Sequence, residues 1–471
     1  MSFVEEVDEV PPADSLGRVH FVGVGGAGMS GIARIMLARD VAVSGCDAKD
    51  SRALAALRVL GADIAVGHSA DHIGAVDTVV TSSAIRPGNP DLVAARAAGR
   101  LVLPRAAALA SVMAGSRGLA VAGTAGKTTT TSMLTVALQS CGRDPSYAIG
   151  GDLNEPGSNA HAGTGEFFVA EADESDRSFL LLEPEAAIVT NVEPDHLDNY
   201  GRPEAVAEAF AQFVGRIRAG GCAVLGADDD GSRALVAVAA ERGLQPVTFG
   251  MAADADVRVA DLRLIDDGAV FGLVAGGRRL GEVRLQVPGR HNALNAAAAL
   301  ALGLALGLPF TDMARGLAEF SGARRRFELK GLARGVRVYD DYAHHPTKVQ
   351  AALAAARQVA GSGRVIAVFQ PHLFSRTAHF APEFGDALSA ADYVVVTDVY
   401  AAREDPVPGV TGALVADAVA LSRDRVLFEP SLSAVPAAVA EWAEPGDLVM
   451  TIGAGDVTIL GSEILLALEE R

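Results

Sequence analysis

The sequence predicts an α/β protein with parallel sheets arranged in three domains. Short runs of β-branched residues alternate with Ala- and Leu-rich stretches, which is the pattern of strand–helix units around parallel sheets. These runs form three series along the chain, one for each domain. The candidate strands are 18–24, 41–45 and 77–82, then 118–123, 167–171, 186–191 and 222–226, and finally 336–340, 364–370, 393–398 and 447–453.

Two stretches mark the expected domain boundaries. MAGSRG at 113–118 precedes a new strand–loop–helix opening, and the basic GARRRFE at 322–328 follows a helix and precedes the third strand series. We therefore expect domains at 1–113, 114–323 and 324–471. A chain of 471 residues is long enough for about two to four domains of ordinary size.

Composition and charge exclude several classes of protein. The formal charge of −18 argues against a general affinity for nucleic acid, and the 50% hydrophobic content against disorder. The three cysteines have no CxxC spacing, so they support neither a disulfide framework nor a zinc cage. The N-terminus is acidic, unlike a secretory signal, and the longest apolar stretch, 296–310, reads as a buried helix. We expect a cytoplasmic protein with no membrane or nucleic-acid partner, as a monomer or weak homodimer.

The first glycine-rich loop is GVGGAG, from Gly23 to Gly28, between a predicted strand and helix. Glycines there let the backbone approach a diphosphate, and the helix N-terminus directs N–H groups at the anion. Asp47 closes the next strand, where an acidic residue would contact a ribose hydroxyl. The loop predicts a dinucleotide or nucleotide-diphosphate site, with a turn that merely packs helix on strand as the alternative.

The second loop, LAVAGTAGKTTTT, is more specific. It places Gly123, Gly126, Lys127 and Thr128 between an apolar strand and a helix. The strict GxxxxGK[ST] template needs glycine where this chain has Val121, so the match is to a shorter GTxGKT loop. The amides still form an anion nest, the lysine can meet phosphates, and the threonine hydroxyl can bind Mg²⁺. A Gly-Lys turn without function is the alternative.

Acidic and histidine residues follow two later strands of the central series. EFFVAEADESD ends in Glu171, Asp173, Glu174 and Asp176, and AIVTNVEPDHLD ends near His196. Ligands of open α/β sheets bind at the carboxyl ends of strands, and Mg²⁺ prefers one or two carboxylates plus phosphates and water. These residues are therefore candidates for a metal shell, with a solvated acidic turn and an ordinary loop histidine as alternatives.

Three further motifs carry polar residues. PGRHNALNAAAA opens a helix with Asn292 and Asn295, whose amides suit an adenine edge, although N-capping explains one of them equally well. VYDDYAHHPT and FQPHLFSRT place acids, histidines and Arg376 at strand ends of the last domain, where an amino acid and an acyl phosphate could bind. Adjacent His344 and His345 cannot easily face one ion, so we expect no metal there.

Together these motifs resemble the Mur ligases. The matching stretches run in family order from about residue 20 to 456, and they are GVGGAGMSGIA, TSSAI, GTAGKTTTT, EADESD, TNVEPDHLD, GRHNALNA, ARRRFE, DDYAHHPT, FQPHLFSRT and TIGAGDV. The resemblance implies a Rossmann-like N-terminal domain for a UDP sugar, a central P-loop ATPase-like domain, and a Rossmann-like C-terminal domain for an amino acid. It also implies ATP-dependent ligation of L-alanine to UDP-N-acetylmuramate through an acyl phosphate, in peptidoglycan precursor synthesis.

The resemblance also assigns site residues. It implies that the UDP sugar contacts Gly25, Gly26, Gly28, Met29, Ser30, Asp47, Ser82 and Ser83. ATP would contact Gly123, Thr124, Ala125, Gly126, Lys127, Thr128, Thr129, Asn292 and Asn295. Mg²⁺ would be held by Thr128, Glu171 and His196. The catalytic residues implied are Lys127, His196, Arg326, His344 and Arg376, with Arg326 on the transferring phosphate and the last two near L-alanine.

The chain also departs from the family pattern. Ala125 stands where the family loop usually has histidine, and Leu373 where arginine is common. The absence of lysine from 199–219 is usual for the branch that adds L-alanine. Three other functions remain open from the sequence: a nicotinamide dehydrogenase using the first loop, a nucleotide-binding regulator without catalysis, and a ligase that attaches a preformed peptide to the same UDP sugar.

Overall fold

The computed structural model describes residues 10–82, 84–151, 153, 159–402 and 404–471, so the predicted substrate residue Ser83 lies outside the described residues. The chain divides into two compact units. Unit 1 contains Met1–Ala260, Gly272–Val283 and Leu294–Glu319, and unit 2 contains Asp261–Phe271, Arg284–Ala293 and Phe320–Arg471. The domain boundaries expected near residues 113 and 323 remain predictions.

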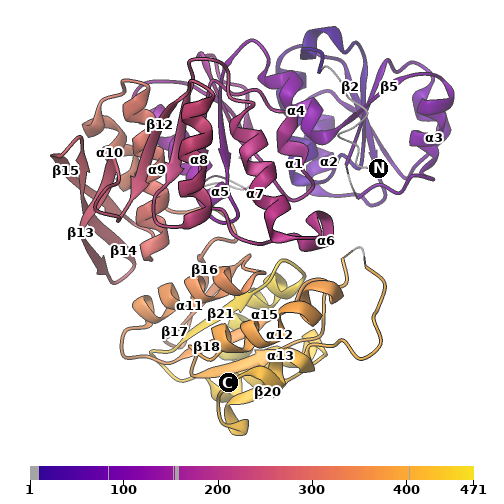
Figure 1. Ribbon diagram of the computed structural model, residues 1–471. Helices are drawn as coiled ribbons and strands as arrows, with labels where there is room; N and C mark the ends of the chain where they lie inside the picture. The colour runs from indigo at the N-terminus through magenta and orange to yellow at the C-terminus, as the bar shows by residue number, and fades with distance from the viewer. Residues whose placement is uncertain (1–9, 83, 152, 154–158, 403) are drawn as a thin grey trace. The chain divides into compact units, whose positions relative to one another are not determined.

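The first sheet of unit 1 is parallel and has the strand order β3-β2-β1-β4-β5 (Figure 1, indigo). The order changes direction between β1 and β4. In open α/β sheets such a switch point leaves a crevice at the carboxyl ends of the strands, which is where the first glycine loop begins. The strands are β1 (Val19–Val22), β2 (Val43–Asp47), β3 (Asp63–Val66), β4 (Thr78–Thr81) and β5 (Leu101–Pro104).

Helices cover both faces of this sheet. Successive side chains of a strand point to opposite faces, so Phe21 packs into one core while Val22 packs with Cys46 and Ile73 into another. The covering elements are α1 (Ala27–Ala38), α2 (Arg52–Val59), α3 (Pro90–Ala97), α4 (Arg105–Met113), and the short 3₁₀ helices η2 (Ala13–Ser15) and η3 (Ala70–Ile73).

The second sheet has the order β15-β14-β13-β12-β11-β10-β6-β9-β7-β8, so β6 lies between β10 and β9. Neighbouring strands are parallel from β13 through β12, β11, β10, β6 and β9 to β7, and β8 is antiparallel to β7. The strands are β6 (Arg117–Ala122), β7 (Ser146–Ala148), β8 (Ala160–His161), β9 (Phe167–Glu171), β10 (Ala186–Val189), β11 (Cys222–Gly226), β12 (Gln245–Gly250), β13 (Val257–Ile265), β14 (Gly268–Ala275) and β15 (Arg278–Leu285).

The helices that follow these strands are mostly amphipathic or buried. The apolar stretch 296–310 was predicted as one buried helix; its first part lies in α9, where residues 296–302 are all buried, but α9 ends at Ala305 and α10 begins at Phe310. No helix among the described residues is long and apolar enough to cross a membrane. The elements are α5 (Lys127–Ser140), η4 (Ser178–Leu181), α6 (Leu197–Tyr200), α7 (Pro203–Val214), α8 (Asp230–Glu241), α9 (Arg290–Ala305) and α10 (Phe310–Glu319).

The sheet of unit 2 has the order β16-β17-β21-β18-β19-β20 and is parallel except for β16 (Figure 1, orange to yellow). Two separate buried clusters lie on its two faces. The strands are β16 (Glu328–Ala333), β17 (Val336–Asp341), β18 (Val365–Phe369), β19 (Tyr393–Val396), β20 (Val426–Phe428) and β21 (Leu448–Ile452). The helices are α11 (Pro346–Ala360), α12 (Phe374–Leu388), α13 (Ala413–Ala418), η5 (Arg423–Arg425), η6 (Leu432–Ala434), α14 (Val435–Trp442) and α15 (Val457–Glu470).

The three sheets confirm the predicted α/β class. Each predicted strand is present, with shifts at the ends; the run predicted at 41–45, for example, is β2, Val43–Asp47. The prediction did not include β3, β5, β7, β8, β12 to β16 or β20.

Candidate active site

The second glycine loop leaves β6 and enters α5 through two glycines with left-handed backbone. Gly123 has φ 137° and Gly126 has φ 84°, conformations that residues with a β carbon rarely adopt. The surroundings are also closed to a side chain. A β carbon at Gly126 would lie 2.5 Å from Asn295 Oδ1, and one at Gly123 would collide with the Thr190 hydroxyl. Both predicted glycines are therefore required by the geometry of the turn.

The end of β10 holds this loop in place. The Asn191 amide accepts a bond from the Ala125 N–H at 2.9 Å and donates to the Ala125 carbonyl at 3.1 Å. Thr190 Oγ1 donates to the same carbonyl at 2.6 Å. The Thr124 hydroxyl accepts from the Glu193 N–H at 2.9 Å and donates to the Glu193 carbonyl at 3.1 Å. Thr190 and Asn191 belong to the TNVEPDHLD motif but were not predicted as site residues.

Lys127 is a cation held inside the loop. Its Nζ donates to the Gly123 carbonyl at 2.8 Å and to Glu174 Oε1 at 2.8 Å, and it lies 2.6 Å from Glu174 Oε2. Burial disfavours the charged form, but attraction to Glu174 and Asp173 outweighs it, so the pKa of Lys127 is raised. The lysine therefore stays charged at the N-terminus of α5, a position where the helix dipole otherwise disfavours a cation.

Thr128 and Glu171 form a second pair beside the lysine. The Thr128 hydroxyl donates to Glu171 Oε1 at 3.0 Å, and Glu171 Oε2 accepts the Gly150 N–H at 2.7 Å. Both residues were predicted as Mg²⁺ ligands, and the fold brings them together from α5 and the end of β9. A hydroxyl and a carboxylate are oxygen ligands of the kind that Mg²⁺ prefers.

His196, the third predicted metal ligand, lies beside Glu174 rather than beside Glu171. Its Nε2 is 3.7 Å from Glu174 Oε1 and 3.7 Å from Asp195 Oδ2. Its φ of 54° is left-handed, and the Asp195 carboxylate accepts its backbone N–H at 2.7 Å. The Tyr200 hydroxyl donates to the Glu174 carbonyl at 2.5 Å and so ties the segment that follows His196 to Glu174. The structure thus places His196 beside Glu174, in the group that surrounds Lys127.

Two further residues predicted to contact ATP, Thr129 and Asn295, lie at the second glycine loop. Thr129 is buried in the first turn of α5, and the buried Asn295 lies against Gly126. The Asn292 amide donates to the Pro288 carbonyl at 2.7 Å.

The first glycine loop is built differently. Gly23 has φ 80°, and the Gly25 N–H donates to Asp47 Oδ2 at 2.9 Å. Asp47 was predicted to contact a ribose, and here one of its oxygens holds the loop. Gly26 is the N-cap of α1, and the predicted residues Met29 and Ser30 are buried in that helix, with Ser30 Oγ donating to the Ala27 carbonyl at 3.1 Å. Both side chains pack in the helix, and their contact with a UDP sugar stays a prediction.

Arg105 was not predicted but lies at the first loop. A β carbon at Gly28 would lie 3.1 Å from Arg105 Cδ, and Arg105 Nη2 is 3.5 Å from Asp173 Oδ2. Burial alone would raise the pKa of Asp173, but Lys127 and Arg105 attract its charged form, so that pKa is lowered. Ser82 is the other predicted residue nearby, with its Oγ 3.9 Å from a β carbon built on Gly23.

In unit 2 the predicted histidines lie in a row of rings. The ring centroids of His344 and His372 are 6.0 Å apart, and those of His372 and Tyr400 are 5.8 Å apart and stacked. His344 Nδ1 is 2.9 Å from the Tyr342 carbonyl. The neighbouring His345 turns to Phe380 instead, with centroids 5.1 Å apart, so the two adjacent histidines contact different partners. Arg376 is buried in the first turn of α12.

The basic segment before β16 lies at the same end of the unit 2 sheet. The guanidinium of Arg326 is 5.2 Å from the Tyr342 ring centroid, and that of Arg325 is 4.9 Å away on the same ring. Asp341 accepts the N–H groups of Phe327 and Ala343, each at 2.8 Å. Burial nevertheless raises the pKa of Asp341. Leu373, which replaces a common arginine, is buried with φ 68°.

The fold and the Gly-Lys-Thr turn define a class, the α/β proteins with a phosphate-binding loop at a parallel-strand end. Within this class, three family descriptions match: "Mur ligase family, catalytic domain" at residues 18–117, "Mur ligase middle domain" at 121–303, and "Mur ligase, glutamate ligase domain" at 325–455. The chain belongs to the Mur ligase family, as the motifs predicted.

Individual relatives are similar over nearly the whole chain. A UDP-N-acetylmuramate–L-alanine ligase from Acidothermus cellulolyticus is 58% identical, covering 98% of this chain and 97% of the relative. A protein with the same name from Saccharopolyspora erythraea is 57% identical, covering 97% and 94%. The crystal structure of UDP-N-acetylmuramate-alanine ligase from Thermotoga maritima has 29% identity and a TM-score of 0.81, covering 96% and 99%. A murein peptide ligase from Psychrobacter arcticus shares the fold, with a TM-score of 0.70 at 24% identity, covering 97% and 99%.

Proposed function

We propose that this chain joins L-alanine to the lactyl carboxylate of UDP-N-acetylmuramate, at the expense of ATP, in peptidoglycan precursor synthesis. The observation that carries the proposal is the paired arrangement in which Lys127 meets Glu174 and Thr128 meets Glu171. A lysine and a hydroxyl beside acids at a phosphate loop suit transfer of a phosphoryl group better than simple binding of a diphosphate. The 58% identity to a relative named for this reaction supports the choice of substrates.

The residues present fit a magnesium nucleotide. Thr128 and Glu171 supply two oxygens 3.0 Å apart, and we assign both, together with His196, to Mg²⁺. The bound metal would neutralise phosphate charge and orient the phosphate oxygens. The N–H groups from Gly123 to Thr129 would cradle the phosphates, and Asn292 and Asn295 would contact the adenine.

The reaction needs two steps. A carboxylate oxygen of the muramate attacks the γ-phosphorus in line, the bond between that phosphorus and the β–γ bridging oxygen breaks, and ADP leaves. The amine of L-alanine then attacks the acyl carbon, loses a proton, and expels inorganic phosphate. Lys127 would stabilise charge on the transferring group, because its ammonium is fixed by the Gly123 carbonyl at 2.8 Å and needs little reorganisation.

The other predicted residues receive roles in binding. We assign the first glycine loop, with Gly25, Gly26, Gly28, Ser82 and Asp47, to the UDP diphosphate and ribose. In unit 2 we assign Arg326 to the transferring phosphate, and His344 and Arg376 to L-alanine. Arginine suits that last role because its planar fork matches a carboxylate.

A preformed peptide is the second candidate for the amine, because a murein peptide ligase shares this fold. Both reactions need the same activation chemistry. The sequence identity of 58% to a relative named for L-alanine, against 24% to the peptide ligase, favours the single amino acid.

Phosphate release tests the proposal. The purified chain is given MgATP and either L-alanine or the peptide L-Ala-γ-D-Glu-meso-diaminopimelate, each with and without UDP-N-acetylmuramate. We expect phosphate only when the UDP sugar and L-alanine are both present. Release with the peptide instead would transfer the assignment to the second candidate. Nucleotide binding without any release would indicate a regulator, and an absorbance change with NAD(P)H would indicate a dehydrogenase.

We also propose a cytoplasmic location and a monomer or weak homodimer, with no nucleic-acid or membrane partner. The three free cysteines suit a reducing compartment. The net charge of −18 disfavours nucleic acid. Light scattering at several concentrations measures the oligomeric state directly.

A further inference from the structure

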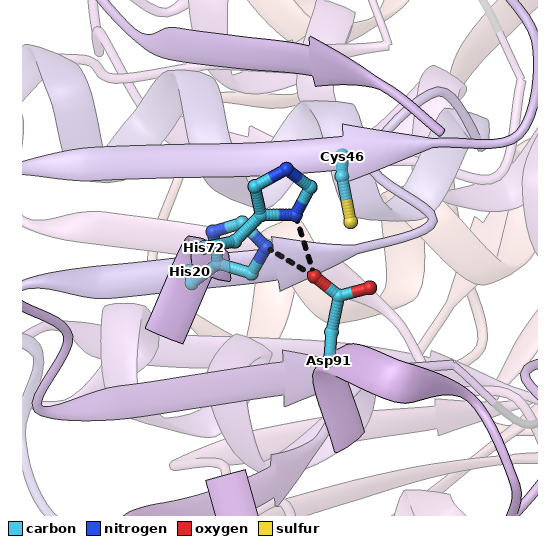
Figure 2. A group of neighbouring side chains, drawn as sticks. All are labelled: His20, Cys46, His72 and Asp91. Atoms are coloured by element: carbon cyan, nitrogen blue, oxygen red, sulfur yellow. Dashed lines mark hydrogen bonds and ion pairs between the residues drawn. The ribbon is translucent and has the colours of Figure 1, made fainter. Parts of the chain in front are cut away.

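A compact group of metal-ligating side chains lies on one face of the first sheet of unit 1, the face that η3 and α3 cover. His20 comes from β1, Cys46 from β2, His72 from η3 and Asp91 from the first turn of α3 (Figure 2). Each offers one ligand atom, and these four atoms all lie within 4.8 Å of one another. Four elements far apart in the sequence therefore aim nitrogen, sulfur and oxygen at one point.

The register of the sheet explains the meeting. His20 pairs with Ser44 across β1 and β2, so the side chains of His20, Ser44 and Cys46 point to the same face. That face is covered by η3 and α3, which supply His72 and Asp91. His20, Cys46 and Asp91 are at most 2% exposed, so three of the four groups are shielded from water.

Distances within the group resemble those of a ligand shell. Asp91 Oδ1 is 2.7 Å from His72 Nδ1 and 3.6 Å from His20 Nε2 (Figure 2). A tetrahedral metal with bonds of about 2.0 to 2.3 Å separates its ligand atoms by roughly 3.3 to 3.8 Å. Side-chain adjustments of roughly 1 Å would bring the four atoms to those separations.

The charge balance also points to a cation. Asp91 is fully buried, and its ion-pair partners among the described residues are three imidazoles, those of His20, His68 and His72, with no lysine or arginine. A buried carboxylate is costly unless a full positive charge or a metal compensates it. A divalent ion would supply that charge and would also use the sulfur of Cys46.

Neighbouring groups orient the ligands in the way that outer partners orient ligands of known metal sites. His20 Nδ1 lies 2.9 Å from Ser44 Oγ, which leaves Nε2 as the nitrogen turned toward Asp91. His68 Nδ1 lies 3.2 Å from Cys46 Sγ and 3.2 Å from Asp91 Oδ2. His68 is thus placed to support the ligands or to replace one of them.

We propose that His20 Nε2, Cys46 Sγ, His72 Nδ1 and an Asp91 carboxylate oxygen form a site for one divalent transition-metal ion of the zinc type. On binding, Cys46 releases its thiol proton to solvent and coordinates as the thiolate. The mixed nitrogen, sulfur and oxygen donors favour Zn²⁺ over Mg²⁺, which prefers oxygen ligands. With four protein ligands the site is structural, because no position is left open for a substrate.

The backbone of Cys46 contacts the first glycine loop. The Cys46 carbonyl accepts the N–H groups of Gly23 and Val24 at 2.8 and 3.1 Å. An ion that ties β1, β2, η3 and α3 together would therefore hold the backbone from which that loop starts. The site is separate from the residues assigned to ATP, so this proposal stands or falls independently of the proposed function.

Metal content and cobalt spectroscopy test the site on the full chain. The protein, purified without chelator and dialysed, is analysed for metals by mass spectrometry, and chelator-treated protein is titrated with Co²⁺. We expect about one zinc per chain, and one Co²⁺ that gives the intense thiolate charge-transfer and visible bands of a tetrahedral sulfur site. Cys46→Ser should lose the charge-transfer band and bind Co²⁺ at least about 100-fold more weakly.

Cys222→Ser is the matched control, since Cys222 is a free cysteine on β11 outside the group. It should keep both the zinc and the cobalt bands. Should Cys46→Ser fail to fold, the wild-type titration decides alone. A wild-type chain that is free of zinc as purified and shows no stoichiometric thiolate band with Co²⁺ overturns the proposal and identifies the group as a metal-free hydrogen-bonded network. Cobalt bands that persist in folded Cys46→Ser but vanish in Cys222→Ser also overturn it.

Discussion

The loops at Gly23–Gly28 and Gly123–Thr129 each join a parallel strand to the N-terminus of a helix, but they obtain their charge in different ways. The second loop carries its own cation, Lys127, beside Glu174. The residues of the first loop, from Gly23 to Gly28, include no lysine, and the side chain of Arg105 approaches Gly28 from α4. In the first loop the Gly25 N–H donates to the carboxylate of Asp47. The second loop is held instead by the uncharged side chains of Thr190 and Asn191.

This difference relates local structure to chemistry. A strand–glycine–helix turn supplies N–H groups for phosphate in both places. Transfer of a phosphoryl group needs a fixed charge at the reacting atoms, and recognition of a diphosphate does not. Lys127, inside the second loop, therefore distinguishes the loop that we assign to catalysis. The first loop, which we assign to binding, is approached by Arg105 from another helix.

Replacing Lys127 tests the catalytic loop most severely. Lys127→Ala should lower kcat by about 10³-fold, because it removes a preorganised charge from the transferring group. Initial rates of phosphate release with saturating substrates measure the effect. Binding of UDP-N-acetylmuramate, followed by calorimetry, should change little, which separates this variant from one that unfolds. A Lys127→Ala enzyme with a near-normal rate would falsify the assignment of the second loop.

The hydroxyl of Thr128 should have the next largest effect. Thr128→Val keeps the shape but removes the group that donates to Glu171 at 3.0 Å, and we expect a loss of about 10 to 100-fold, with a higher Mg²⁺ requirement. Titration of activity with Mg²⁺ measures it. Thr135→Val is the matched control, because Thr135 lies in the same helix and donates to the Thr131 carbonyl at 2.8 Å, one turn away from the loop. Equal losses in both variants would attribute the effect to helix stability.

Arg105 tests the binding loop. Arg105→Ala should weaken binding of UDP-N-acetylmuramate by about 10-fold, equal to about 1.4 kcal/mol, and leave the KM for ATP unchanged. Calorimetry of the UDP sugar and initial rates at varied ATP measure the two effects. Arg143→Ala is the control, since Arg143 is half-exposed and pairs with Glu166. A variant that lost ATP affinity and kept sugar affinity would reverse the roles of the two loops.

The smallest effect concerns Asp173, whose charged form both Lys127 and Arg105 stabilise. Its pKa is lowered in the folded state, so its contribution to stability is present above the unfolded value of 3.8 and is lost as the pH falls through the folded value. Arg105→Ala removes one of those two charges and brings the folded pKa of Asp173 back toward 3.8, so the loss of stability on acidification should be smaller and complete at a higher pH. Melting temperatures from pH 3 to 6 measure the shift, and an unchanged acid profile relative to Arg143→Ala would contradict it.

The geometry of the second glycine loop was predictable because its signal is local. A glycine, a lysine and a threonine stand in one short turn, and the strand and helix on either side are apolar enough to be recognised. Thr128 and Glu171 were also predictable, since both follow central strands of one parallel sheet. Asn191 and Arg105 were not. Their roles arise from contacts with Ala125 and Gly28 that exist only after strands and helices pack.

The fold shows the same limit. Long apolar runs such as β6 and β9 were found, whereas β7 and β8, with three and two residues, are too short to give a pattern. Cysteine spacing pointed away from a zinc cage, yet the fold brings Cys46 to His20 and His72. Those residues come from separate elements, and only the pairing of β1 with β2 places their side chains on one face.

The hydrogen bonds from the segment after β10 to Thr124 and Ala125 have a thermodynamic consequence. A turn already ordered by neighbouring side chains loses little freedom when an anion enters it, so the entropic cost of ordering that usually opposes loop closure on a ligand is mostly absent. Association of a nucleotide at this turn should therefore be fast and carry only a small entropic cost of ordering the loop. Any slow ordering in the catalytic cycle would then have to arise elsewhere in the chain.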